Sequence, residues 1–209
     1  MSDHLIITLS RTYGSGGREL GKMLAARHGI KAYGSELIKM AADKSGIRPE
    51  YFERVDEKPT DSFLYTLATN ALSFGSSINP YDHTLSSEKL FNQQADIIRE
   101  IADREDCVII GRCGGYILRD MPRCVKIFLT APLDFRIHRV MEYEEATQQQ
   151  AEKSIKAMDK RRESYFGYYT GREWGACSTY DLALDTSTVG IEGAADLIDQ
   201  YLRIRFGEN

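Results

Sequence analysis

A glycine-rich stretch near the amino terminus has residue types and spacing that could bind a phosphate. The sequence RTYGSGGREL, residues 11–20, follows the apolar run HLIITLS and leads into GKMLAARHGI. Glycine adopts positive φ and lets a ligand approach closely, so these glycines can expose consecutive backbone N–H groups. A helix beginning near Arg18 would direct its positive dipole end at the same point. The order of strand, glycines and helix therefore favours a phosphate-binding loop over a tight turn without a ligand.

Two residues of a standard phosphate loop are missing from this stretch. The pattern G-x-x-x-x-G-K-[ST] ends on a lysine and a hydroxyl residue, and this chain has neither. Arg18 is the candidate for the missing positive charge, with Arg11 as a second source. Ser10 or Ser15 could hold a metal-bound water, and the metal ligands themselves stay undetermined. The residues expected to bind the phosphates of a nucleotide are Tyr13, Gly14, Ser15, Gly16, Gly17, Arg18 and Glu19.

A dinucleotide-binding loop is the alternative interpretation of the same residues. That loop needs G-x-G-x-x-G, and Gly14 and Gly16 fit its first two positions. Glu19 stands at the third position, and Gly21 comes two residues late. Glu36, shortly after the second expected strand, could serve as a ribose-binding acid. This alternative stays open, as the weaker of the two.

Basic residues gather in two further places. Arg112 follows the apolar run CVIIG and is flanked by glycines, a setting that favours phosphate binding over a surface ion pair. The segment DKRRESYFGYYTGREWG places Lys160, Arg161 and Arg162 before a run of aromatic residues. If the glycine-rich loop binds a phosphate that is transferred, at least one cation must reach the developing charge, which favours a phosphate-facing role over a solvated basic helix.

The elements that would position these residues alternate along the chain. Short β-branched apolar runs at 5–9, 107–111 and 124–131, with weaker ones at 32–33 and 179–187, predict strands. Amphipathic segments between them predict helices, among them 87–104 and a long polar helix from about 147. Strands separated by helices favour a parallel α/β sheet of about five strands, covered by helices on both faces. Ligands of such sheets bind beyond the carboxyl ends of the strands, where the glycine loop and Arg112 would meet.

The bulk properties fit one ordinary globular domain. The 209 residues carry a net charge of -4, which argues against a broad nucleic-acid-binding face. No apolar run reaches the length of a membrane span, and no secretory signal pattern opens the chain. The four cysteines form no CxxC pair, so reduced thiols in a cytoplasmic protein are expected. The oligomeric state is not determined by the sequence.

Five blocks taken together resemble the cytidylate kinase-like family, within the nucleoside monophosphate kinase branch of P-loop proteins. They are ITLSRTYGSGGRELGKMLA, IIGRCGGYIL, VKIFLTAPLDFRIHRV, DKRRESYFGYYTGREWG and YDLALDTS. The resemblance covers nearly the whole chain and preserves the motif order. It implies a P-loop fold in one domain over residues 1–209, with a mobile acceptor arm near 57–87 and a lid near 147–176.

The resemblance also implies an activity and a set of roles. ATP with Mg²⁺ would donate a phosphoryl group to a nucleoside monophosphate or a similar small phosphate acceptor. Cys113 replaces the acid of the G-R-D motif that helps to recognise CMP, which puts cytosine specificity in question. The catalytic candidates are Arg18, Arg112, Arg161 and Arg162, and the acceptor would contact Arg112, Arg139, Asp159 and Lys160. A nucleotide-binding sensor that kept the fold and lost turnover is the non-enzyme alternative.

Overall fold

A five-stranded parallel sheet forms the centre of the protein. The computed structural model describes residues 3–45 and 80–207. The strand order is β2-β3-β1-β4-β5, and every neighbouring pair is parallel. The first strand is central, because Ile6 lies beside both Cys107 and Cys124. The strands are β1 (Ile6–Arg11), β2 (Lys31–Tyr33), β3 (Cys107–Ile110), β4 (Cys124–Thr130) and β5 (Leu182–Asp185).

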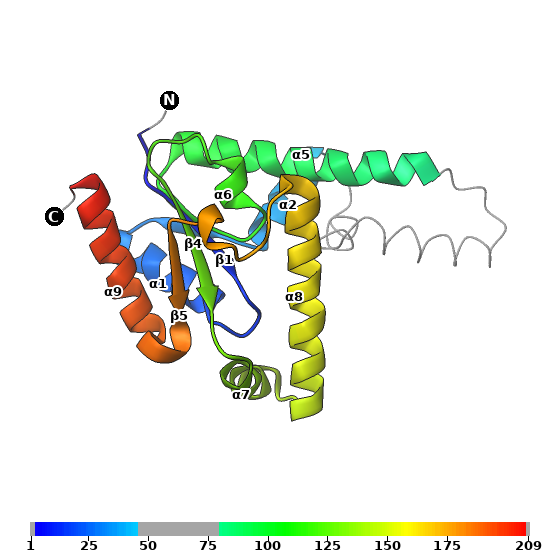
Figure 1. The fold of residues 1–209 in the computed structure, drawn as a ribbon. Coiled ribbons are helices and arrows are strands. Elements are labelled where there is room, and N and C mark those ends of the chain that lie inside the picture. Colours follow the sequence, from blue (N-terminus) through cyan, green and yellow to red (C-terminus); the bar gives the residue numbers. More distant parts are fainter. Residues whose placement is uncertain (1–2, 46–79, 208–209) are drawn as a thin grey trace.

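Helices cover both faces of this sheet, so the fold is a three-layer α/β sandwich of the P-loop type (Figure 1). One face packs on α1 (Gly17–His28) and α9 (Thr186–Phe206). The other packs on α2 (Glu36–Ser45), α5 (Pro80–Arg104), α6 (Gly114–Ile117) and α8 (Gln148–Thr170). α7 (Leu133–Glu144) follows the carboxyl end of β4 and packs with α8, and the short 3-10 helix η1 (Cys177–Thr179) precedes β5.

The alternation of side chains along β1 produces the two cores. Ile6 belongs to the core beneath α5 and α8, whereas Ile7 and Leu9 belong to the core beneath α1 and α9. All three side chains are almost fully buried. Strands buried on both faces read as continuous apolar runs, which is why β1, β3 and β4 are recognisable in the sequence.

The strand order distinguishes two interpretations of the glycine loop. In dinucleotide-binding domains the order 3-2-1-4-5-6 places the second strand beside the first. Here β3 lies between β2 and β1. The order therefore favours the phosphate-loop interpretation over the dinucleotide alternative.

Some boundaries differ from the sequence expectations. α5 begins at Pro80, so residues 80–87, expected in the acceptor arm, form the first turns of this helix. Their polar sequence lacks the apolar spacing that reveals a helix, although proline suits a helix start. The remainder of the expected arm, 57–79, lies outside the described residues. Within the described ranges, no helix has the length and apolar character needed to cross a membrane.

Candidate active site

The glycine loop joins the carboxyl end of β1 to the amino end of α1. Gly14 and Gly16 both have a φ of 85°, a left-handed conformation that strongly favours glycine. Gly16 is the N-cap of α1 and provides no side-chain capping hydrogen bond. The N–H groups in the first turn of a helix have no intrahelical acceptor, and together with the helix dipole they attract an anion. The geometry of the loop thus suits a phosphate group.

Two of the glycines are also required by close packing inside the protein. A Cβ on Gly14 would lie 3.0 Å from both Cβ and the carbonyl oxygen of Arg136, on α7. A Cβ on Gly17 would lie 2.7 Å from Cγ of Arg11. The backbone of the loop therefore lies directly against α7 and against the end of β1.

Hydrogen bonds from two hydroxyl groups fix the buried part of the loop around Ser15. Ser15 is fully buried, and its Oγ donates to the carbonyl oxygens of Thr12, at 2.8 Å, and Leu129, at 3.3 Å. Thr186, at the start of α9, donates from Oγ1 to the carbonyl oxygen of Ser15 at 2.9 Å. These bonds make Ser15 a structural residue of the loop, and they engage the hydroxyl that the sequence suggested for a metal-bound water.

A charged pair holds the backbone of Tyr13, immediately before the glycines. Asp159 of α8 accepts the backbone N–H of Tyr13 through Oδ1 at 2.7 Å. Arg136 donates from Nη1 to the Tyr13 carbonyl oxygen at 3.1 Å and to Oδ2 of Asp159 at 2.6 Å. Its Nε donates to the carbonyl oxygen of Ala131 at 2.9 Å. We call Tyr13, Arg136 and Asp159 the loop clamp, because they join the loop to α7 and α8.

The Tyr13 side chain extends the same set of contacts. Its hydroxyl donates to Glu144, and its ring packs edge-to-face with Tyr143 at a centroid distance of 6.4 Å. Burial, followed by the hydrogen bond to Glu144, raises the pKa of Tyr13 well above its usual value. The Arg162 guanidinium lies 5.4 Å from the ring centroid, within cation–π range. Tyr13 therefore anchors the loop and stays a neutral hydrogen-bond donor at physiological pH.

The predicted cations differ in where they lie. Arg162 is buried and donates from Nη1 to the carbonyl oxygen of Arg11 at 3.2 Å, at the carboxyl end of β1. Arg139 pairs with Glu19 of α1 at 2.6 Å. Arg18 is exposed, and its charge helps to lower the pKa of Glu36, after the larger effect of backbone hydrogen bonds. The structure thus brings Arg162 and Arg139 to the loop.

The other two cations predicted from the sequence run 160–162 lie elsewhere on α8. Lys160 is exposed on α8, and Arg161 is half-buried on the same helix. Asp159 and Arg162 are three residues apart and face the loop, so Lys160 and Arg161 project from other sides of α8.

The loop after β3 is strained in the way functional loops often are. Gly111, Arg112 and Cys113 have consecutive φ values of 78°, 59° and 54°. Two non-glycine residues in the left-handed region cost about 1–3 kcal/mol each. Arg112 is buried and donates to Oε1 of Gln94 at 3.3 Å, so it is not a surface side chain. Cys113 is buried as well and is the N-cap of α6, consistent with a small packing residue.

A narrow cleft lies next to this strained loop. It is lined from β1 by Thr8, Leu9 and Ser10, and from the surrounding segments by Gly111, Gly115, Tyr116, Phe166, Arg172, Thr179 and Tyr180. The Arg172 guanidinium lies 5.6 Å from the Tyr116 ring centroid. The sequence did not predict a role for Arg172. Its only signal was its position within the basic and aromatic segment DKRRESYFGYYTGREWG.

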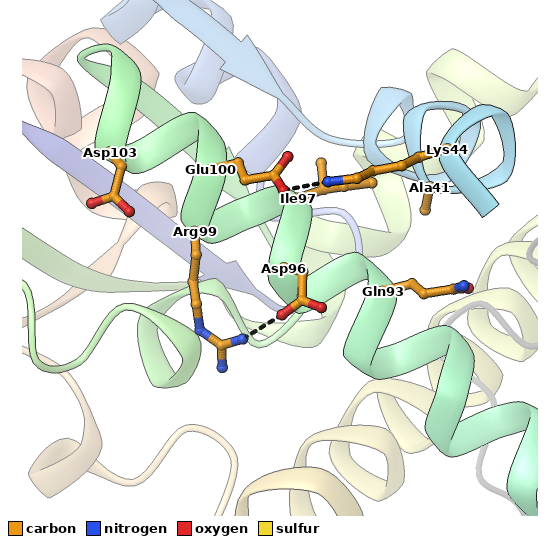
Figure 2. Close-up of a pocket in the computed structure, with 8 residues that line it drawn as sticks. All are labelled: Ala41, Lys44, Gln93, Asp96, Ile97, Arg99, Glu100 and Asp103. Atoms are coloured by element: carbon orange, nitrogen blue, oxygen red, sulfur yellow. Dashed lines mark hydrogen bonds and ion pairs between the residues drawn. The ribbon is translucent and has the colours of Figure 1, made fainter.

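A second hollow lies away from these groups. It occupies about 420 Å³ between α2 and α5. Figure 2 shows Lys44 of α2 extended to Glu100 of α5, and Asp96 paired with Arg99 along α5. None of the candidate site residues lines it, so we do not assign it to the active site.

The described residues offer no preformed metal site. Among residues 3–45 and 80–207, no group of three histidine, cysteine or carboxylate side chains is arranged to hold a metal ion. Glu19 of the loop and Asp159 of the loop clamp are both paired with arginines. Magnesium commonly binds through phosphates and water with only one or two carboxylates, so this arrangement fits an ion that arrives with a nucleotide.

A family model and curated relatives match most of this chain. The model of the cytidylate kinase-like family matches residues 6–188. A cytidylate kinase from Pyrococcus horikoshii is 25% identical over 198 residues, covering 94% of this chain and 87% of that protein. One from Pyrococcus furiosus is 26% identical over 196 residues, covering 93% and 86%.

Solved structures show the same fold. An uncharacterized protein from Eubacterium ventriosum superposes with a TM-score of 0.70 at 27% identity, covering 95% of this chain and 98% of that one. A shikimate kinase from Acinetobacter baumannii, in complex with shikimate, gives a TM-score of 0.54 at 14% identity, covering 99% and 97%. At that identity the likeness concerns the fold alone.

Proposed function

The chain belongs to the cytidylate kinase-like family, and from this premise we propose that it transfers the γ-phosphoryl group of ATP to a small phosphate acceptor. The acceptor that best fits the proposal is a nucleoside monophosphate. The observation that carries the proposal is the uncapped amino end of α1, reached through Gly14 and Gly16 and faced by arginines from α7 and α8. Phosphoryl transfer depends mainly on positioning and on positive charge around the phosphates.

The donor phosphates would bind to the loop from Tyr13 to Glu19. The backbone N–H groups at the start of α1 would hold phosphate oxygens, and the loop clamp would keep these groups oriented before ATP arrives. A preoriented set of donors needs no rearrangement when charge develops. Magnesium, bound with ATP, would neutralise part of the phosphate charge.

The acceptor would bind beside the carboxyl ends of β1 and β3. Arg112 is held at this edge by the left-handed turn, and the neighbouring cleft presents Tyr116 and Arg172. A guanidinium can bind a phosphate with two parallel hydrogen bonds, which suits Arg112 for the acceptor phosphate. Arg162 lies between the two sides, at the end of β1, and would reach the transferring group.

A sensor without turnover is the second candidate, and one observation favours it. The loop has no lysine, and Arg18 is exposed near Glu36. A sensor would bind ATP through the same backbone groups without the cation that promotes transfer.

A coupled assay of ADP release separates the two candidates. Purified protein with Mg²⁺ and ATP would be screened against CMP, UMP, AMP, GMP, dCMP and dTMP, with calorimetric ATP binding measured in parallel. A kinase gives acceptor-dependent ADP release above the ATPase background. ATP binding without release for any acceptor would support the sensor, and absence of ATP binding would contradict both.

A further inference from the structure

The pair formed by Glu19 and Arg139 lies where a nucleotide phosphate would bind. Nη2 of Arg139 is 2.6 Å from Oε2 of Glu19. The same nitrogen would be 3.5 Å from a Cβ placed on Gly16, the N-cap of α1. The guanidinium, carried by α7, therefore lies over the open end of α1.

Two positive features meet at this point. The amino end of a helix carries roughly half a positive charge, and the guanidinium adds a full one. The Glu19 carboxylate, in the first turn of α1, is the counter-charge that both features share. Within the part of the chain that the structure describes, the buried Arg139 Nε has no hydrogen-bond partner, so the guanidinium retains an unused donor. A buried donor without an acceptor is costly, which indicates that Arg139 is not fully satisfied by Glu19.

We propose that Glu19 is an internal anion that occupies Arg139 until a nucleotide phosphate displaces it. On this account Arg139, in place of the missing loop lysine, supplies the cation nearest the donor phosphates. The Glu19 side chain is 55% exposed, so it can turn into solvent without leaving a buried charge. The exchange makes and breaks only ionic contacts. The inference rests on the proposed function, because it needs ATP to bind at the loop.

Arg18 fits this role less well than Arg139. It precedes Glu19 on α1, is exposed, and acts electrostatically on Glu36 at the start of α2. Arg139 is 28% exposed and is held against the loop by its contact with Glu19. The test therefore concerns Arg139. Arg27, in the last turn of α1 and paired with Asp196, has similar chemistry at a distance from the loop and serves as the control.

The test measures the dissociation constant of ATP by titration calorimetry, with and without Mg²⁺. Glu19→Gln should tighten ATP binding by up to about fivefold in both conditions, the range that an exposed ion pair contributes. Arg139→Gln should weaken it by about tenfold or more, because a charge-assisted contact is lost. In the double variant, removal of Glu19 should give little tightening, since no guanidinium remains to be released. Arg27→Gln, in the last turn of α1 at the end opposite the loop, is the control and should change the constant by less than about twofold.

Each contrary result has its own meaning. Weaker binding of Glu19→Gln in both conditions would show that Glu19 positions Arg139, and this would overturn the inference. Weakening only with Mg²⁺ would overturn it in favour of Glu19 as a metal ligand. An unchanged constant would also contradict it. A parent protein that fails to bind ATP would remove the proposed function as well, whereas the other outcomes leave that function intact. Circular dichroism melting of each variant would confirm folding.

Discussion

Asp159 of α8 accepts a hydrogen bond from the backbone N–H of Tyr13, 146 residues earlier in the chain, at 2.7 Å. Its other carboxylate oxygen is 2.6 Å from Nη1 of Arg136. Both oxygens are thus engaged within the protein, although the family resemblance implies a substrate contact for this residue. Through this carboxylate, the position of α8 and the shape of the glycine loop depend on each other.

Removing the Asp159 carboxylate should loosen the loop. The two partners are largely buried, with side-chain exposures of 12% for Arg136 and 20% for Asp159. Asp159→Ala should therefore lower the free energy of unfolding by about 2–3 kcal/mol, because Arg136 loses its counter-charge. Amide hydrogen exchange of Tyr13 should accelerate, and Asp159→Asn should slow it again, because the amide oxygen still accepts.

The control for this prediction is a surface pair. Asp196 pairs with Arg27 at 2.7 Å, and its side chain is 71% exposed. Asp196→Ala should change stability by less than about 0.5 kcal/mol. Equal Tyr13 exchange rates in the parent and in Asp159→Ala would count against the clamp.

Gly14 should tolerate a side chain less well than a glycine elsewhere that also has a positive φ. Gly14→Ala adds a contact of 3.0 Å with Arg136 to the strain of a positive φ. Gly29, with a φ of 63°, has nothing within 4 Å of the added Cβ, so Gly29→Ala measures strain alone, at about 1 kcal/mol. Chemical denaturation should show a larger loss for Gly14→Ala. Equal losses would mean that α7 can yield to the added methyl group.

Thiol labelling should separate the four cysteines. Burial raises the pKa of Cys107 and of Cys124 to about 12, and Cys113 is buried too, whereas Cys177 is exposed in η1. The thiolate is the reactive form, so one thiol per chain should react rapidly with a disulfide reagent at pH 8. Cys177→Ser should abolish that fast phase. Rapid reaction of more than one thiol in the folded parent would contradict the packing of the sheet.

Acid should remove one electrostatic contribution near β2. Hydrogen bonds from Lys31, Tyr33 and Arg104 lower the pKa of Glu105 to about 2. A carboxyl group with a depressed folded-state pKa stabilises the fold above its unfolded pKa of about 4.3, and this contribution is lost as the pH falls toward 2. The difference in urea midpoint between the parent and Glu105→Gln should thus be largest near neutral pH and shrink below pH 4. A constant difference would argue against these hydrogen bonds. Asp120→Asn, at an 84% exposed side chain, is the control.

The sequence predicts the strands, helix and loop that form this site better than it predicts the side-chain contacts between them. Local sequence patterns are enough to recognise some elements without knowledge of the fold. These are the apolar runs of β1, β3 and β4 and the glycines between β1 and α1. Arg136 and Arg139 are three residues apart on α7, a spacing that places them on one helical face, and both contact the loop. The contact of Asp159 with Tyr13 joins distant segments, and no local pattern encodes it.

Two other features could not be predicted from the sequence, for different reasons. The positive φ of Arg112 and Cys113 is imposed by tertiary packing, against the preference of both residue types. The exposed position of Arg18 depends on where α1 begins, at Gly17, a boundary that sequence patterns locate only to within a few residues.

Transfer of the terminal phosphate from ATP tests the central claim most directly. The parent protein and Gly16→Val would be incubated with Mg²⁺, γ-labelled ATP and each nucleoside monophosphate, and the products would be separated by chromatography. A Cβ on Gly16 would lie 2.3 Å from Cδ1 of Ile191, and it would crowd the open end of α1. We predict a labelled nucleoside diphosphate with at least one acceptor for the parent, and none above background for a folded Gly16→Val. Background label for the parent with every acceptor would contradict the kinase assignment, and equal transfer by both proteins would place the donor site elsewhere.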